Sequence, residues 1–138
     1  MTPTVYPAHI LLVEDDAINL FVARKLLGKH HQIESAVNHR EAFQLLELQN
    51  FDVILLDINL GGDSLDGVAI LRHIRQRYPE WNVPVFAVTS YAMSEDRVKY
   101  LKAGFDRYFP KPINRFEILN AIEEELFKAR NQKKRGVG

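Results

Sequence analysis

Residues 53–59 read VILLDIN, four apolar side chains in a row followed by the carboxylate of Asp57. A short run without polar alternation is typical of a strand in a parallel sheet that is covered on both faces. Residues 10–13 (ILLV) and 83–88 (VPVFAV) repeat this pattern. Functional groups in an open parallel sheet gather beyond the carboxyl ends of the strands, so Asp57 is a candidate site residue.

Segments with a helical spacing of apolar residues lie between these runs. We expect the first helix to bury a stripe made of Leu20, Val22, Ala23, Leu26 and Leu27. Helix ends are indicated by two capping boxes and two closing glycines: Asn38 with Glu41, Asn114 with Glu117, Gly28 and Gly104. Two weaker strands, at 31–37 and 107–109, complete five strand–helix repeats. This order predicts an α/β fold with a five-stranded doubly wound parallel sheet and right-handed crossovers.

The composition is that of an ordinary globular domain, with 138 residues, 46% hydrophobic and 26% charged. Eighteen basic and eighteen acidic residues give a formal net charge of zero, which argues against nucleic-acid binding. The chain has no cysteine, which excludes disulfides and thiolate metal sites. No apolar run is long enough to span a membrane and the start of the chain lacks a signal-peptide pattern, so we expect a cytoplasmic protein.

Side chains with useful chemistry follow four of the predicted strands: Glu14, Asp15 and Asp16, then Asp57 and Asn59, then Thr89, then Lys111. Clustered carboxylates need a compensating cation, and ligands that offer only oxygen suit Mg²⁺. A carboxylate can also attack phosphorus and form an acyl phosphate. A hydroxyl and an ammonium can stabilise the oxygens of the transferring phosphoryl group. The pattern therefore indicates phosphoryl transfer onto an aspartate.

Ordered motifs at the ends of successive elements carry a family resemblance: residues 13–16 (VEDD), 55–59 (LLDIN), 66–67 (DG), 88–90 (VTS) and 111–112 (KP). From about residue 8 to residue 128 the chain closely resembles the response-regulator receiver domains of two-component signalling, of the chemotaxis-regulator type. The resemblance implies a flavodoxin-like (βα)5 fold with strand order 2-1-3-4-5. We expect a receiver domain at 8–130 and an N-terminal extension at 1–7, and the polar, basic composition of 131–138 predicts a flexible tail.

By this resemblance, Asp57 would accept a phosphoryl group from a histidine kinase or a histidine phosphotransfer protein. Glu14, Asp15 and Asp57 would bind Mg²⁺ together with the backbone carbonyl of Asn59. The chain would be a signalling domain and not an enzyme in the usual sense, because it would catalyse only its own phosphorylation and dephosphorylation.

The resemblance also assigns Thr89 and Lys111 to the phosphoryl group and implies a cis peptide bond between Lys111 and Pro112. Thr89 and Tyr108 would form the switch that changes an output surface on the fourth helix, the fifth strand and the fifth helix. That surface would serve a downstream protein or a homodimer. Static packing would explain Tyr108 equally well.

Two other functions fit parts of the pattern. A phosphohydrolase of the haloacid-dehalogenase type uses two aspartates separated by one residue, whereas this chain has Asn59 at the second position; turnover of p-nitrophenyl phosphate would distinguish the two. A receiver-like binding module without phosphorylation is disfavoured by the intact acidic residues. Residues 60–67 form a loop about two residues longer than the commonest form of the family, and we expect it to be more mobile.

Tyr91, two residues after Thr89, is expected to cover the path of the water that hydrolyses the acyl phosphate. Asn59 could orient that water, but an aromatic ring excludes water outright, so we expect shielding to dominate. Tyr91→Ala and Tyr91→Glu should lose phosphate up to about tenfold faster, which corresponds to roughly 1.4 kcal/mol in the barrier. The measurement is the dephosphorylation rate in Mg²⁺ buffer, and equal rates in all three proteins would show that Tyr91 is no shield.

Overall fold

The computed structural model describes residues 7–61, 64–90 and 94–136, with the backbone alone at residue 94 and at residues 132–136. Strands and helices alternate in this part of the chain: β1 (His9–Val13), α1 (Ala17–Leu27), β2 (Gln32–Ala36), α2 (His39–Leu48), β3 (Val53–Asp57), α3 (Gly67–Arg77), β4 (Val85–Thr89), α4 (Ser94–Ala103), β5 (Arg107–Pro110) and α5 (Arg115–Gly136). The strands form one parallel sheet in the order β2-β1-β3-β4-β5. The predicted fold class and strand order are confirmed.

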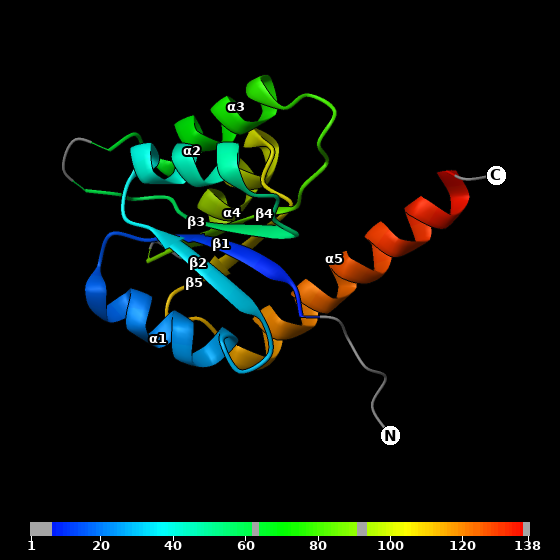
Figure 1. The fold of residues 1–138 in the computed structure, drawn as a ribbon. Helices are drawn as coiled ribbons and strands as arrows, with labels where there is room; N and C mark the ends of the chain where they lie inside the picture. Colours follow the sequence, from blue (N-terminus) through cyan, green and yellow to red (C-terminus); the bar gives the residue numbers. More distant parts are fainter. Residues whose placement is uncertain (1–6, 62–63, 91–93, 137–138) are drawn as a thin grey trace.

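Helices cover both faces of the sheet, with α1 and α5 on one face and α2, α3 and α4 on the other (Figure 1). Successive side chains of β3 therefore enter different cores. Ile54 and Leu56 belong to the core under α2 and α3. Val53 and Leu55 belong to the core under α1 and α5. Since each face is buried, the strand needs an apolar residue at every position, which accounts for the unbroken apolar run.

Local contacts confirm all four of the expected helix ends. Gly28 directly follows α1, and its N–H donates to the Arg24 carbonyl over 2.8 Å. The Glu41 N–H donates to Asn38 Oδ1 over 2.9 Å at the start of α2, and the Glu117 N–H donates to Asn114 Oδ1 over 3.1 Å at the start of α5. Gly104 has a φ of 115° directly after α4, a conformation that favours glycine. These signals determine where each helix begins or ends, and hence which residues are left in the loops above the strand ends.

The first helix differs from the expected stripe at one residue. Ala23 and Leu27 are buried, but Val22 is 47% exposed. One residue turns an α-helix by about 100°, so Val22 lies at the border of the apolar stripe, about 100° around the helix axis from the buried Ala23. Val22 lies instead beside the candidate site, as described below.

The last helix continues further than the sequence indicated. We expected a tail from residue 131, whereas α5 runs on to Gly136 and projects past the sheet (Figure 1). Glutamine, lysine and arginine favour helix, and basic side chains near a helix C-terminus interact well with the helix dipole. No helix in the described part of the chain is long and apolar enough for a membrane span.

Gly67 brings α3 close to the end of β3. Its N–H donates to the Ile58 carbonyl over 3.0 Å. A Cβ at this position would lie 2.8 Å from Ile58 Cα and 2.9 Å from the Asp57 carbonyl oxygen. The neighbouring Asp66 caps the helix by accepting from the Ala69 N–H over 2.9 Å. The Asp-Gly pair therefore combines a helix start with a close backbone approach.

We predict that Gly67→Ala lowers the free energy of unfolding by about 1–3 kcal/mol, because backbone atoms must shift to admit the methyl group. Urea denaturation would measure the change. Gln76→Ala on the exposed face of the same helix is the control and should stay within about 0.5 kcal/mol of the wild type. Equal stability of Gly67→Ala and the control would contradict the close approach.

Candidate functional site

Two neighbouring strands bring the acidic side chains together. Glu14 and Asp15 follow β1, and Asp57 is the last residue of β3, which pairs with β1. One carboxylate oxygen from each residue lies within 4.8 Å of the other two. Asp16 has a different role, since its carboxylate accepts from the Ile18 N–H and caps α1. The structure thus gathers three of the four acidic residues that the sequence placed at this edge.

Lys111 enters the same cluster from the far end of the chain. Its Nζ lies 2.7 Å from Glu14 Oε1 and 3.0 Å from Asp57 Oδ2. Its N–H donates to the Thr89 carbonyl over 2.7 Å, which ties the loop after β5 to the end of β4. The Lys111–Pro112 peptide bond is cis, as expected. One ammonium therefore serves two buried carboxylates.

Burial governs the ionisation of this cluster. Glu14 is only 4% exposed, and its desolvation raises its pKa from 4.5 to about 7 despite the hydrogen bond from Lys111. Burial also lowers the pKa of Lys111, but its hydrogen bonds to Glu14 and Asp57 outweigh this effect, and the net direction is upward. The lysine therefore stays charged, while the metal-free site resists a full set of negative charges.

Asn59 links the acidic cluster to the end of β4. Its backbone N–H donates to Asp57 Oδ1 over 3.1 Å, and its side-chain Nδ2 donates to Thr89 Oγ1 over 3.3 Å. Thr89 is fully buried. The sequence predicts a role for the Asn59 carbonyl as a metal ligand but gives no signal for this contact between side chains.

Tyr108 lies further along the same side of the sheet. Its ring stacks on that of Tyr100 from α4, with centroids 6.1 Å apart and planes 15° apart. This stacking is compatible with both a switch and static packing, so the switch role stays a prediction. Tyr91 lies outside the described residues, and its shielding role also stays a prediction.

A small cavity of about 140 Å³ adjoins Asp57 and Lys111. Asn19, Val22 and Ile113 line it, and none of the three had been assigned to the site. Their spacing in the sequence carries no signal for this, because the cavity forms where α1 meets the loop after β5.

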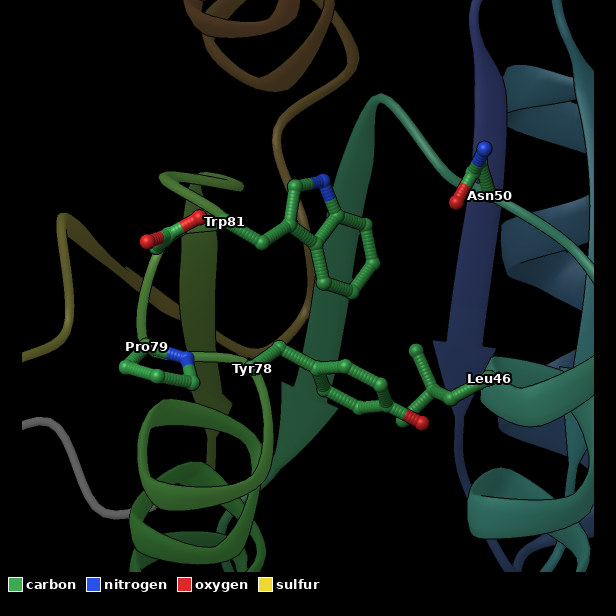
Figure 2. A pocket seen from close by; sticks show the side chains of 6 residues that line it. Leu46, Asn50, Tyr78, Pro79 and Trp81 are labelled. Carbon is green, nitrogen blue, oxygen red and sulfur yellow. The ribbon is translucent and has the colours of Figure 1, made fainter.

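A larger pocket of about 520 Å³ lies at the opposite end of the strands, where β3 and β4 begin (Figure 2). It is lined by the segments that lead into these two strands. Tyr78 and Trp81 extend across it toward Leu46 and Asn50. Glu80 is the one carboxylate among its lining residues. The pocket offers neither a carboxylate cluster nor a lysine, so the chemistry lies at the Asp57 edge.

The carboxylates of Glu14, Asp15 and Asp57 fit a divalent cation with a preference for oxygen. Mg²⁺ is bound in proteins by one or two carboxylates together with phosphate oxygens and waters. The raised pKa of Glu14 supports the same conclusion, since a cation would offset the cost of burying its charge and the smaller repulsion from Asp57. The donor set therefore suits magnesium and phosphoryl chemistry.

Comparison with known proteins shows where this arrangement recurs. A family model described as the response regulator receiver domain matches residues 10–123. Stress response regulator protein 1 of Debaryomyces hansenii is 34% identical over 130 residues, which cover 91% of this chain and 53% of that protein. The aerobic respiration control sensor protein ArcB of Escherichia coli is 32% identical over 107 residues, 77% of this chain and 14% of ArcB. The chain thus spans about half of one relative and a small part of the other.

Solved structures of receiver domains are similar to this chain in sequence and in fold. The receiver domain of the sensor histidine kinase PA1611 from Pseudomonas aeruginosa, with magnesium coordinated in its active site cleft, is 32% identical. It aligns with a TM-score of 0.75 over 86% of this chain and 96% of that one. A CheY-like receiver domain protein from Methanospirillum hungatei is 30% identical, with a TM-score of 0.78 over 91% of this chain and 98% of that one.

The pKa of Glu14 predicts how stability depends on pH without metal. The folded protein keeps the Glu14 proton up to about pH 7, whereas the unfolded chain loses it near pH 4.5. The stability that this group contributes is therefore present below pH 4.5 and is lost as the pH rises through 7. In EDTA, Glu14→Gln should gain stability relative to wild type between pH 5 and pH 8, by on the order of 1 kcal/mol.

Urea denaturation at both pH values would measure this gain. Glu80→Gln, which removes an exposed carboxylate at the opposite end of the strands, is the control and should show no such change with pH. A Glu14→Gln variant that follows the wild type at both pH values would contradict the burial of an ionisable Glu14.

Proposed function

The chain belongs to the response regulator receiver domain family, and on that premise we propose that Asp57 is the residue that accepts the phosphoryl group. Receiver domains are phosphorylation-dependent signalling switches that pair with histidine kinases or phosphotransfer proteins. One observation carries the assignment to Asp57. Its carboxylate is buried between the Lys111 ammonium and the carboxylates of Glu14 and Asp15.

In the proposed reaction an oxygen of the Asp57 carboxylate attacks phosphorus, the bond from phosphorus to the donor histidine breaks, and an acyl phosphate forms. Glu14, Asp15, Asp57 and the Asn59 carbonyl would hold Mg²⁺, which supplies positive charge next to the phosphoryl oxygens. Lys111 is 3.0 Å from Asp57 and is placed to pair with a phosphoryl oxygen. The same pocket would admit the water that later hydrolyses the acyl phosphate.

We further propose that Thr89 turns its hydroxyl from Asn59 toward the new phosphoryl group, and that Tyr108 moves with it. The support is the position of both residues along the β4–β5 edge and the stacking of Tyr108 on Tyr100 of α4. A groove of about 440 Å³ that includes Arg97, Tyr108 and Glu117 lies on the face formed by α4, β5 and α5. We propose this face as the output surface for a downstream protein or a homodimer, and the cytoplasm as the location, on the sequence expectation alone.

We predict that acetyl phosphate with Mg²⁺ transfers one phosphoryl group to the wild type and none to Asp57→Asn, as measured by intact mass. Asp16→Asn is the matched control, because it removes a neighbouring charge and keeps a residue that can cap α1. Equal labelling of the wild type and Asp57→Asn would place the acceptor elsewhere. Turnover of p-nitrophenyl phosphate by the wild type would favour a phosphohydrolase.

A further inference from the structure

The loop between β3 and α3 is tied to the first residue of α2. The Leu65 N–H donates to His39 Nδ1 over 3.1 Å, and the His39 N–H donates to Ser64 Oγ over 3.1 Å. The Ser64 hydroxyl in turn lies 2.9 Å from the Leu65 carbonyl. His39 therefore holds two successive loop residues, 25 and 26 positions away along the chain.

The other end of this loop contacts the acidic cluster. The Gly61 N–H donates to Asp15 Oδ2 over 2.8 Å. The approach is close, since a Cβ on Gly61 would lie 3.0 Å from the same oxygen. Asp15 is the exposed member of the cluster, whereas Glu14 and Asp57 are buried. Burial restrains the carboxylates of Glu14 and Asp57. The exposed Asp15 carboxylate is restrained instead by its hydrogen bond from the Gly61 N–H.

The His39 ring is itself supported. It packs edge-on against Phe43, with centroids 5.7 Å apart, and Phe43 stacks on His73 of α3 at 3.8 Å. Because Nδ1 accepts the Leu65 amide proton, it carries no proton of its own, and the neutral ring has its proton on Nε2. The ring therefore acts as a fixed acceptor that faces the loop.

We propose, on the premise that Glu14, Asp15 and Asp57 bind Mg²⁺ as above, that His39 is a positioning residue for this site. His39 holds Ser64 and Leu65, the Ser64 N–H donates to the Gly61 carbonyl over 3.5 Å, and the Gly61 N–H orients the Asp15 carboxylate toward the cation. Hydrogen bonds to a ligating carboxylate commonly change metal affinity by about 10–100-fold. His39 acts one step further away, so we expect a smaller effect, about five- to tenfold.

Three variants separate this role from simple packing. His39→Ala removes the acceptor. His39→Asn places Oδ1 near the position of Nδ1 and can still accept from the Leu65 N–H. His73→Ala removes the other imidazole that packs on Phe43 and leaves the loop contacts in place. Two measurements apply to all three: amide hydrogen exchange at Gly61 and Leu65 in the metal-free protein, and Mg²⁺ affinity by calorimetry.

We expect faster exchange at both amides and Mg²⁺ binding about five- to tenfold weaker in His39→Ala, with values near those of the wild type in His39→Asn and His73→Ala. If Leu65 alone exchanges faster and Mg²⁺ affinity is unchanged, His39 does not position the site, while the proposed function stands. If His39→Asn behaves like His39→Ala, hydrogen-bond acceptance is not the cause and the inference fails. A wild type that binds no Mg²⁺ overturns the magnesium part of the proposed function, and the exchange at Gly61 then decides alone whether His39 restrains the loop.

Discussion

The buried carboxylates of Glu14 and Asp57 share the ammonium of Lys111 at the carboxyl ends of the strands. The rest of the site depends on this contact. Lys111 reaches Glu14 and Asp57 at once, although it lies 97 and 54 residues away from them in the chain. Burial raises the pKa of Glu14, and the neighbouring Asp57 carboxylate adds to this effect despite the hydrogen bond from Lys111. Ionising neighbouring buried carboxylates is unfavourable without a counter-ion. A site of this kind is therefore suited to bind a divalent cation and then a phosphoryl group.

The fold could be predicted from the sequence because its signals are local. Unbroken apolar runs identified the strands that are buried on both faces, and the capping residues Asn38 and Asn114 identified helix starts. The exposed Val22 and the continuation of α5 to Gly136 were missed. An apolar stripe on a helix does not show which residues at its border are buried against the sheet, so Val22 could not be placed. A polar, basic segment is compatible with either a helix or an irregular tail, so the end of α5 could not be placed either.

The candidate site was predictable to the extent that strand ends determine it. The gathering of Glu14, Asp15, Asp57 and Lys111 follows from parallel strands that all end at one edge. Contacts made by loops were not predictable in the same way. The Asn59 amide on Thr89, the Gly61 N–H on Asp15 and the His39 ring on Leu65 join segments whose relative path no periodicity describes.

The central claim is that the acidic cluster at this edge binds one divalent cation, and a calorimetric Mg²⁺ titration of matched charge variants tests it most directly. Asp15→Asn and Asp16→Asn each remove one negative charge from adjacent residues, but only Asp15 belongs to the cluster. We expect one Mg²⁺ per wild-type chain, near-normal affinity in Asp16→Asn and strongly weakened binding in Asp15→Asn. Equal loss of affinity in both variants, or no binding to the wild type, would contradict this claim.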